Sequence, residues 1–555
     1  MKKTRVTLFA LLLLGAVGCN EGFEPDAGLR NPATENQNSV DVAPAEVVYY
    51  NKECASQILG YKENYYKLEH MRTAYSNLMG TTRAESDEII EPTHCHYKFI
   101  PKDGAELTLL EDCPDLELFA YPLDAIVSEG EYFESENPLL RYAVVPIDME
   151  LPDVERELLY EMFIPDDRRT RMPTRCAHID ADLADRLVDE AMRITGNEEE
   201  PINKTRASTW YGRGRLTVYD ESLDVYIPLR GVKVRITRAG VTHTAITDSL
   251  GNFRMTEGFK YGAEYSIIWE RADWDIRDGA TGQANYKAGS NVTDQALNLN
   301  IVGGKSLRYC HIHRACYRHF YQTKLEYVKA VTYHKLKISY MPDLSDSNIR
   351  GKFYDSGAGV VSDIKIYKGS ASRESTMPEI FAVTSHEIGH AAHCFHVNTS
   401  QYNSVDYSIT EGWAEAVAYY TIQEEYEYLT RYSQTLLGTY VNITSNALYY
   451  DALEQRHHSN WPGIISGEGL SYSPLFIDLI DNENQIFTSS TLQSIGGPND
   501  VISGYTFPVL NNVLVGAYAI HTLKTNLRAN KPAGVTDADI DTLFATYEMY
   551  WVNDN

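Results

Sequence analysis

Residues 383–393 contain two histidines and a glutamate whose spacing suits metal chemistry. His386 and His390 are four positions apart, so on a helix they point the same way and both imidazoles can reach one Zn²⁺. Glu387, next to the first histidine, is placed to take a proton from a metal-bound water. Because the pattern fixes only three positions, a third metal ligand is needed to support it.

Glu411 is the first candidate for that ligand. It opens the segment Glu-Gly-Trp-Ala-Glu, which ends at Glu415. This sequence pattern resembles that of the gluzincin clan of zinc metallopeptidases. In that clan a second helix supplies a glutamate some twenty residues or more beyond the histidine pair. The resemblance, close over residues 380–420 and loose over the rest of 304–555, implies Glu411 as the ligand and Glu415 as the carboxylate that orients a ligand histidine. The alternative is that both glutamates lie on a solvated helix face.

His396 is the second candidate, because HEIGHAAHCFH resembles the metzincin spacing HExxHxxGxxH. That family has glycine where this chain has His393, which lets the helix end sharply, and histidine accepts positive φ much less readily than glycine. The family also needs a methionine turn, and after Met377 the only methionine is Met549. We therefore expect Glu411 to be the third ligand and His393 to pack inside the protein.

The chemistry expected of this set is hydrolysis of a peptide bond. Zinc would polarise the scissile carbonyl and acidify a water, and Glu387 would pass the proton to the leaving amine. Tyr518 and His521 lie three apart on an expected helix over 513–523 and are candidates to stabilise the oxyanion. The strand at 363–367 resembles the edge strand on which such enzymes hold an extended peptide, and an internal strand is the alternative. No Gly-x-Met-Glu-Asn exopeptidase motif is present, so endopeptidase activity is the default.

The elements that position this site belong to an expected zinc metallopeptidase domain over 304–555. The sequence predicts a long helix over 308–331, strands at 335–341 and 362–369, and helices from there to the C-terminus. The domain is therefore expected to be mostly helical and zincin-like, with a short sheet. The histidines of the long helix diverge around it, and we expect them to pack rather than bind metal.

Residues 205–303 show short strand-like runs with turns between them, which predicts a small antiparallel β-sandwich. The runs from 228 to 255 resemble the carboxypeptidase-regulatory, transthyretin-like domain. In that resemblance residues 248–251 form a turn and Phe253 fills the core. Such domains are usually accessory, so we expect a spacer or binding module with possible glycan contact. The forty tyrosines of the chain suit carbohydrate or peptide contacts, or simply fill core and surface.

The N-terminal residues have the pattern of an export signal. Residues 1–19 have a positive start, an apolar run too short to span a bilayer, and small residues before Cys19. They resemble a bacterial lipoprotein signal, which implies acylation of Cys19 and anchorage in the outer membrane, on its periplasmic or cell-surface face. Residues 20–45 are expected to form a linker, and 46–204 an α+β domain of unknown role. In that domain a helical pattern covers 58–80, and strands are expected at 97–101 and 142–148.

The composition limits the class of protein. A chain of 555 residues requires several domains, so we expect a multidomain α+β protein. Its formal net charge of −27 argues against nucleic-acid partners. The expected partners are a protein or peptide substrate and, through the N-terminal lipid, a membrane. The rival hypothesis is a surface lipoprotein that binds glycan or protein through its sandwich and carries an inactive metallopeptidase-like domain.

Overall fold

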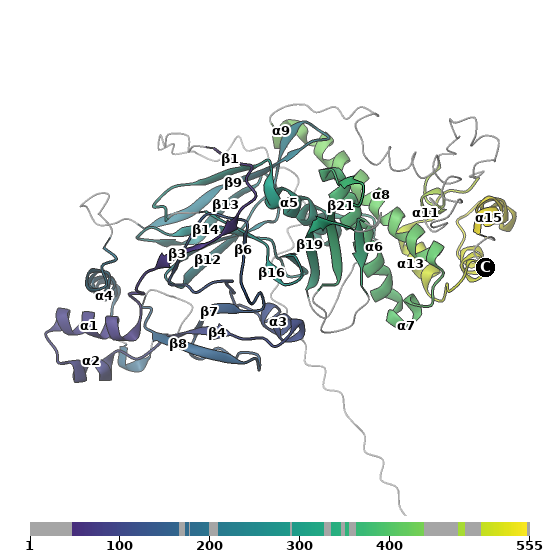
Figure 1. The fold of residues 1–555 in the computed structure, drawn as a ribbon. Helices are drawn as coiled ribbons and strands as arrows, with labels where there is room; N and C mark the ends of the chain where they lie inside the picture. Colours follow the sequence, from purple (N-terminus) through teal and green to yellow (C-terminus); the bar gives the residue numbers. More distant parts are fainter. Residues whose placement is uncertain are drawn as a thin grey trace, which may run out of the picture. The chain divides into compact units, whose positions relative to one another are not determined.

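The computed structural model describes residues 47–165, 173–176, 178–198, 209–288, 291–326, 335–345, 350–354, 362–437, 475–482 and 501–551. The described residues all belong to one compact unit of mixed helices and sheets, shown in Figure 1. The predicted signal segment, Cys19 and the linker lie outside the described residues. Within the described part of the chain, no helix has the length and apolar character that a membrane span requires.

The described part of the N-terminal region is built from short strands and four helices around a three-stranded sheet, β7-β4-β8. The expected strands at 97–101 and 142–148 overlap β4 and β7. The expected helix over 58–80 is wrong in its first part, because Ile58–Tyr61 pairs with β5 as a strand and only the later residues are helical. The elements are β1 (Val48–Tyr50), β2 (Ala55–Ser56), β3 (Ile58–Tyr61), α1 (Leu68–Met79), α2 (Arg83–Ile89), β4 (His94–Phe99), α3 (Gly104–Glu111), β5 (Ala125–Val127), β6 (Tyr132–Phe133), β7 (Arg141–Pro146), β8 (Arg156–Met162) and α4 (Ala181–Ile194).

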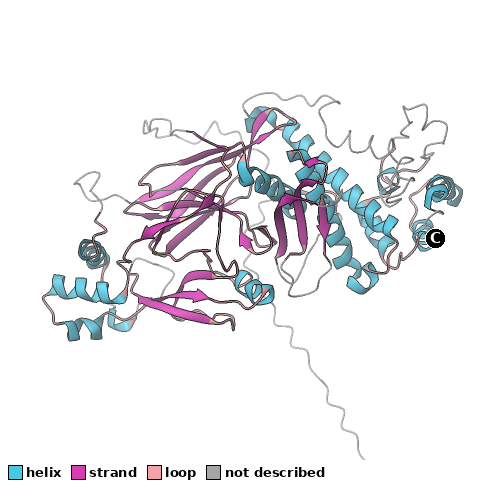
Figure 2. Cartoon of the chain, viewed as in Figure 1, coloured by secondary structure: helices cyan, strands magenta, loops and turns pink. Residues whose placement is uncertain are grey.

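Two sheets form the β-rich middle of the chain (Figure 2). One has the order β1-β18-β9-β10, with β13 also on β9, and the other the order β12-β11-β14-β17. The expected turn at 248–251 forms, with the Gly251 amide donating to the Asp248 carbonyl at 3.0 Å, and Phe253 is buried. The strands are β9 (Trp210–Asp220), β10 (Val225–Pro228), β11 (Lys233–Arg238), β12 (Val241–Ile246), β13 (Asn252–Phe259), β14 (Glu264–Ile268), β17 (Asn285–Lys287) and β18 (Leu297–Ile301).

The expectation of a purely antiparallel sandwich is wrong. Strand β18 runs parallel to β9, and β1 runs parallel to β18. Since β1 comes from the N-terminal region, that region and the sandwich share one sheet. Parallel neighbours far apart in sequence leave no local turn signal, which is why strand patterning alone did not reveal them.

A third sheet, of order β16-β15-β19-β21-β20, lies beside the helices. Strand β15 lies inside the range predicted for the sandwich but pairs in parallel with β19, so this sheet crosses the expected boundary at 303/304. The strand at 363–367 is internal rather than at the edge, because β21 pairs with both β19 and β20. The strands are β15 (Trp274–Asp278), β16 (Gly282–Gln283), β19 (Leu336–Leu344), β20 (Gly351–Phe353), β21 (Ile364–Ser370) and β22 (Arg373–Glu374).

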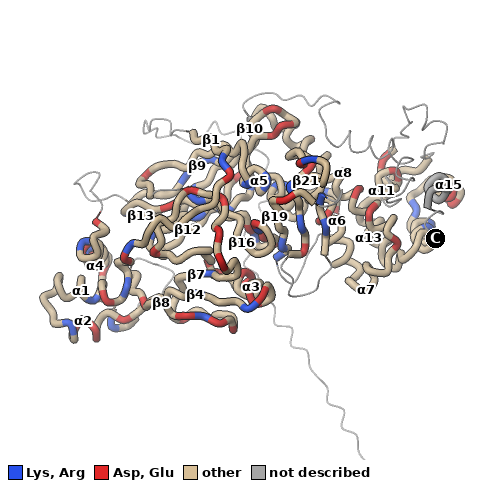
Figure 3. Tube along the Cα trace, in the orientation of Figure 1, with Lys and Arg blue, Asp and Glu red and all other residues tan. Residues whose placement is uncertain are grey.

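Helices make up most of the described chain after β22. The helix expected over 308–331 is shorter than predicted: α5 ends at Tyr317, a π-helical turn follows over Arg318–Gln322, and Thr323 is extended. Charged residues of both signs are interspersed along the described chain (Figure 3). The helices are α5 (Gly304–Tyr317), α6 (Met377–Val397), α7 (Thr399–Tyr402), α8 (Tyr407–Arg431), α9 (Ser433–Leu437), α11 (Leu475–Asp478), α13 (Phe507–Leu514), α14 (Ile520–Ala529) and α15 (Asp537–Trp551).

Helix α6 has strong local signals for its start. Thr376 and Glu379 form a capping box, and Pro378 occupies the first turn. Glu379 also forms ion pairs with Arg350 and Arg373. Burial raises the pKa of Glu379, but its bonds to Arg373 and the Thr376 amide outweigh this effect and lower the pKa to about 2. The helix start is thereby tied to the segments on either side of β21.

A buried ionic cluster joins the sandwich to helices α5 and α8. Glu425 of α8 accepts from Arg230 at 2.7 Å, and it pairs with Arg314 and Arg318. Arg314 also pairs with Asp220 of β9 at 2.9 Å. Burial disfavours the Glu425 carboxylate, but the three guanidinium groups hold its pKa well below the usual range. This residue therefore compensates several positive charges that have left water.

Replacement of Glu425 by Gln should destabilise the protein severely. It leaves buried guanidinium groups without their shared counter-charge, which costs about 3–5 kcal/mol. Urea unfolding followed by circular dichroism measures the change. The control is Glu427→Gln, at an exposed position of the same helix, which should change stability by no more than about 0.5 kcal/mol. Equal midpoints for the two variants would contradict the role given to Glu425.

Candidate metal centre

Three side chains from two helices meet at one point. The Nε2 atoms of His386 and His390 are 3.0 Å apart on α6. One carboxylate oxygen of Glu411, on α8, lies 3.1 Å from the first nitrogen and 3.3 Å from the second. All three residues are buried. The structure thus brings together the three residues that the sequence assigned to the metal.

The donor set fits a zinc ion. Zinc–ligand bonds of about 2.0–2.1 Å in a tetrahedral arrangement place neighbouring donors about 3.3 Å apart, close to the 3.0–3.3 Å seen here. Burial alone lowers the pKa of His386, yet Glu415 and Glu411 raise it well above its ordinary value. Burial raises the pKa of Glu411, but His390 and His386 hold it well below its usual range. The surroundings therefore favour positive charge at the meeting point.

The second nitrogen of each histidine is also engaged. Nδ1 of His386 lies 3.2 Å from a carboxylate oxygen of Glu415, where the sequence analysis expected that residue. Nδ1 of His390 lies 3.0 Å from the Tyr402 hydroxyl. Partners of this kind fix the tautomer that leaves Nε2 free to bind a cation. Tyr402 was not anticipated, since it lies on the short helix α7 and no spacing rule links it to His390.

Glu387 faces strand β20 rather than the other carboxylates of the site. The backbone of Phe353 lies close enough to its carboxylate to act against the rise in its pKa. A β-carbon at Gly351 would lie 2.7 Å from the Glu387 carboxylate oxygen, so glycine permits this close approach. Burial raises the pKa of Glu387, partly offset by His386 and His390. A raised pKa makes the carboxylate a better base near neutral pH.

His396 does not reach the cluster. Helix α6 continues through His393 to Val397, and the Nε2 atom of His396 lies 2.9 Å from the Asn511 carbonyl oxygen. The sharp turn of the metzincin pattern is therefore absent from this helix. His393 is buried between the rings of Tyr402 and Trp413, with centroids at 5.3 and 6.4 Å, as expected for packing. Burial lowers its pKa to about 3.

No protein-family model, curated protein or solved structure matches this chain. The geometry of the site and the sequence pattern are therefore the two indications of what this chain does.

The proposed oxyanion donors lie elsewhere. The expected helix over 513–523 is interrupted, because Gly516 adopts a positive φ of 76° between α13 and α14. Tyr518 therefore stands in a loop with 46% of its surface exposed, and His521 is exposed on α14. Within the described residues, no contact connects either side chain to His386, His390 or Glu411. The structure gives these two assignments no support, and they stay predictions.

Tyr354 is a phenol near Glu387 that no sequence pattern indicated. It directly follows β20 and interacts electrostatically with Glu387. Burial, with a hydrogen bond to Tyr367, raises its pKa to about 12, so the hydroxyl remains protonated and able to donate. Gly351 in a short strand was the only sequence signal for a close approach here, and it does not point to Tyr354 itself.

The other histidine clusters are structural. His94 and His96 are buried on β4, and the His96 ring packs on Tyr160 at 4.9 Å between centroids. The Nε2 atom of His313 on α5 lies 2.9 Å from the Arg230 carbonyl oxygen. Among the described residues, one further group of possible ligands, Glu63, Glu69 and His70, is largely exposed, and Lys67 forms an ion pair with Glu63.

Zinc content should distinguish the two candidates for the third ligand. Glu411→Ala removes a donor that lies within 3.3 Å of both histidine nitrogens. Loss of a residue that merely contacts a metal ligand already lowers metal affinity by ~10–100-fold. The purified variant should therefore retain less than about a tenth of the wild-type zinc after dialysis. His396→Ala should retain it. Mass spectrometry of the metal content checks both variants. Zinc loss confined to His396→Ala would contradict the geometry described.

Proposed function

We propose that this chain is a zinc-dependent peptidase that hydrolyses peptide bonds with a metal-activated water. One observation carries the proposal: a buried carboxylate, Glu387, stands beside a three-donor cluster and contacts the strand at the end of a sheet. His386, His390 and Glu411 would hold the ion. A zinc ion bound there would supply Lewis acidity to the scissile carbonyl and to a water.

The residues of the chain have distinct roles in this proposal. Glu387 takes a proton from the attacking water and passes it to the amine nitrogen that leaves. The Phe353 backbone and the close approach of Gly351 hold its carboxylate in place. Tyr354 donates its hydroxyl hydrogen to the oxygen of the scissile carbonyl as negative charge develops there. Glu415 and Tyr402 orient the two histidines.

An extended peptide is the substrate that this site suits. Strand β20 is the last strand of its sheet among the described residues, with its only strand partner, β21, on one side. A substrate strand can add to such an edge by backbone hydrogen bonds. Because β20 also contacts Glu387, a peptide paired with it would pass close to the base. Backbone pairing holds a peptide in mid-chain, which favours an endopeptidase.

Export and lipid attachment at Cys19 complete the proposal. They depend on the resemblance of residues 1–19 to a lipoprotein signal. The enzyme would then act outside the cytoplasm, held at the outer membrane of a bacterium. Metabolic labelling with a palmitate analogue, lost in Cys19→Ala, tests this part independently of the catalytic one.

Replacement of Glu387 by Gln should abolish peptide hydrolysis. The amide cannot accept the proton, and loss of a general base of this kind lowers kcat by about 10²–10⁴-fold. Hydrolysis of casein and of a fluorogenic peptide library measures the effect. Zinc content and the thermal unfolding midpoint should stay within error of wild type. A wild-type chain that binds zinc but cleaves none of these substrates would leave the binding-lipoprotein alternative as the better account.

Tyr354→Phe should slow turnover while Tyr518→Phe should not. Loss of one oxyanion donor lowers kcat by about 10²–10³-fold, whereas Tyr518 is an exposed loop residue without a contact to the cluster in the described structure. Steady-state kinetics on one cleaved peptide compare the two phenylalanine variants. A larger loss in Tyr518→Phe than in Tyr354→Phe would favour Tyr518, the residue expected from the sequence, over Tyr354.

A further inference from the structure

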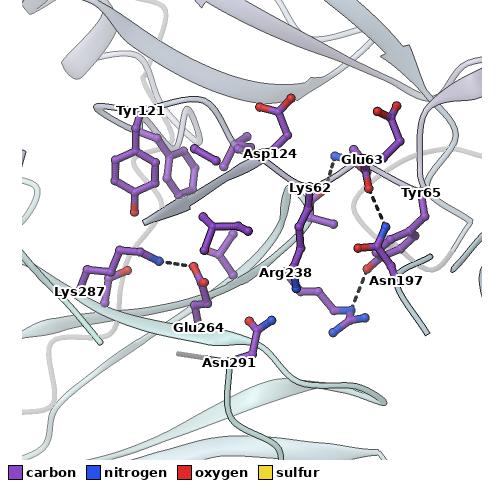
Figure 4. A pocket seen from close by; sticks show the side chains of 18 of the residues that line it. Lys62, Glu63, Tyr65, Tyr121, Asp124, Asn197, Arg238, Glu264, Lys287 and Asn291 are labelled. Atoms are coloured by element: carbon purple, nitrogen blue, oxygen red, sulfur yellow. Dashed lines mark hydrogen bonds and ion pairs between the residues drawn. The ribbon is translucent and has the colours of Figure 1, made fainter. Parts of the chain in front are cut away.

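A cavity of about 320 Å³ lies between the N-terminal region and the sandwich, apart from the metal-binding residues. Its walls come from residues 62–65 and 119–126, from Asn197, and from the sheet β12-β11-β14-β17 (Figure 4). This volume is at the lower end of the ~300–1,000 Å³ typical of small-molecule sites. It is large enough for a ligand of one or two rings.

The cavity carries charges of both signs in equal number: Lys62, Arg238 and Lys287 against Glu63, Asp124 and Glu264. Two of these charges are neutralised by each other, since Lys287 forms an ion pair with Glu264. Glu63 is engaged by Lys67 and His70 outside the cavity. These pairs leave Lys62 and Arg238 opposite Asp124. A lining with charges of both signs and an excess of one has no strong selectivity for an ion, so it suits a neutral polar ligand.

Several polar groups of the cavity retain hydrogen-bonding capacity. Within the described residues, neither the Asp124 carboxylate nor the Lys62 amine has an ion-pair partner within 4.0 Å, and no hydrogen bond is found for the Asn291 amide. The three groups stand around the cavity in Figure 4. Burial raises the pKa of Asp124, a sign that its carboxylate is partly removed from water. Together they offer an acceptor, a donor, and an amide that does both.

Aromatic rings provide the remaining wall. Tyr121 and Tyr65 stand on opposite sides of the cavity in Figure 4. The guanidinium of Arg238 donates to the Tyr65 hydroxyl at 2.7 Å and so fixes that ring. Tyr121 packs edge-on against Phe119 with 6.3 Å between centroids. Rigid aromatic surfaces next to spare donors and acceptors match a molecule with apolar C–H faces and hydroxyl edges.

We propose that this cavity is a binding site for a neutral mono- or disaccharide. Sugar hydroxyls both donate and accept, so one hydroxyl of a sugar can donate to Asp124 while others accept from Lys62 or Asn291. A peptide is the less suitable occupant on the sheet that lines the cavity, because its two central strands, β11 and β14, have no free edge. Strand β11 pairs with both β12 and β14, and β14 pairs with β11 and β17. Recognition must therefore come from side chains.

Binding to the purified full chain tests the proposal. The probes are glucose, galactose, N-acetylglucosamine, cellobiose and lactose, with glycylglycine and alanylalanine as peptide probes, each followed by saturation-transfer NMR and calorimetry. At least one sugar should bind with a Kd of about 1 mM or tighter. Asp124→Asn and Asn291→Ala should each raise that Kd at least about tenfold. The matched control, Asp153→Asn at an exposed position, should leave it unchanged.

Three outcomes would overturn the proposal: no sugar of the panel binds, the dipeptides bind in place of the sugars, or both cavity variants bind as wild type does. Asn291 is exposed, so its variant should fold normally even if Asp124→Asn does not. Glu387→Gln should bind the sugar like wild type. This result separates the sugar site from the proposed peptidase, since either can fail without the other.

Discussion

The close packing of α6 against α8 is the constraint on which the proposed metal centre depends. A β-carbon at Gly389 would lie 3.0 Å from the Ala414 α-carbon, so at this level the two helices approach nearly backbone to backbone. Gly389 lies between His386 and His390 in sequence, and Ala414 lies between Glu411 and Glu415. The short distance between helix axes is what lets side chains of both helices meet within 3.3 Å.

Helix α8 is anchored on both sides of Glu411, by contacts near its first and its last turns. At its start the Asp406 side chain accepts from the Ser408 amide, and the Asp406 amide donates to the Tyr518 carbonyl. Near the C-terminal end of α8, Glu425 forms ion pairs with Arg230 of the β-sandwich and with Arg318, which directly follows α5. Donors carried on anchored helices keep their positions better than donors on loops. The sandwich thus helps to position Glu411 through its contacts with α8. This structural role does not depend on whether the sandwich also binds a ligand.

The sequence predicted the meeting of His386, His390 and Glu411 better than it predicted the sheets. An i, i+4 histidine pair on a helix is a local pattern, so His386, Glu387 and His390 could be recognised without knowing the tertiary structure, and a known motif suggested Glu411. Strand β15 could not be assigned, because its parallel pairing with β19 joins residues about sixty positions apart. Strand β20 is only three residues long. Tyr518 was expected on a helix, because the apolar pattern runs on from residue 513 to residue 523. In the structure Gly516 lies between two separate helices, and Tyr518 stands in the loop.

Anomalous diffraction at the zinc edge, from crystals of the full chain grown with zinc, tests the central claim most directly. We predict one strong peak between α6 and α8, at about 2.0–2.2 Å from Nε2 of His386, from Nε2 of His390 and from the Glu411 carboxylate. A peak next to His396, or well-ordered side chains at the three predicted ligands without a peak between them, would contradict the account.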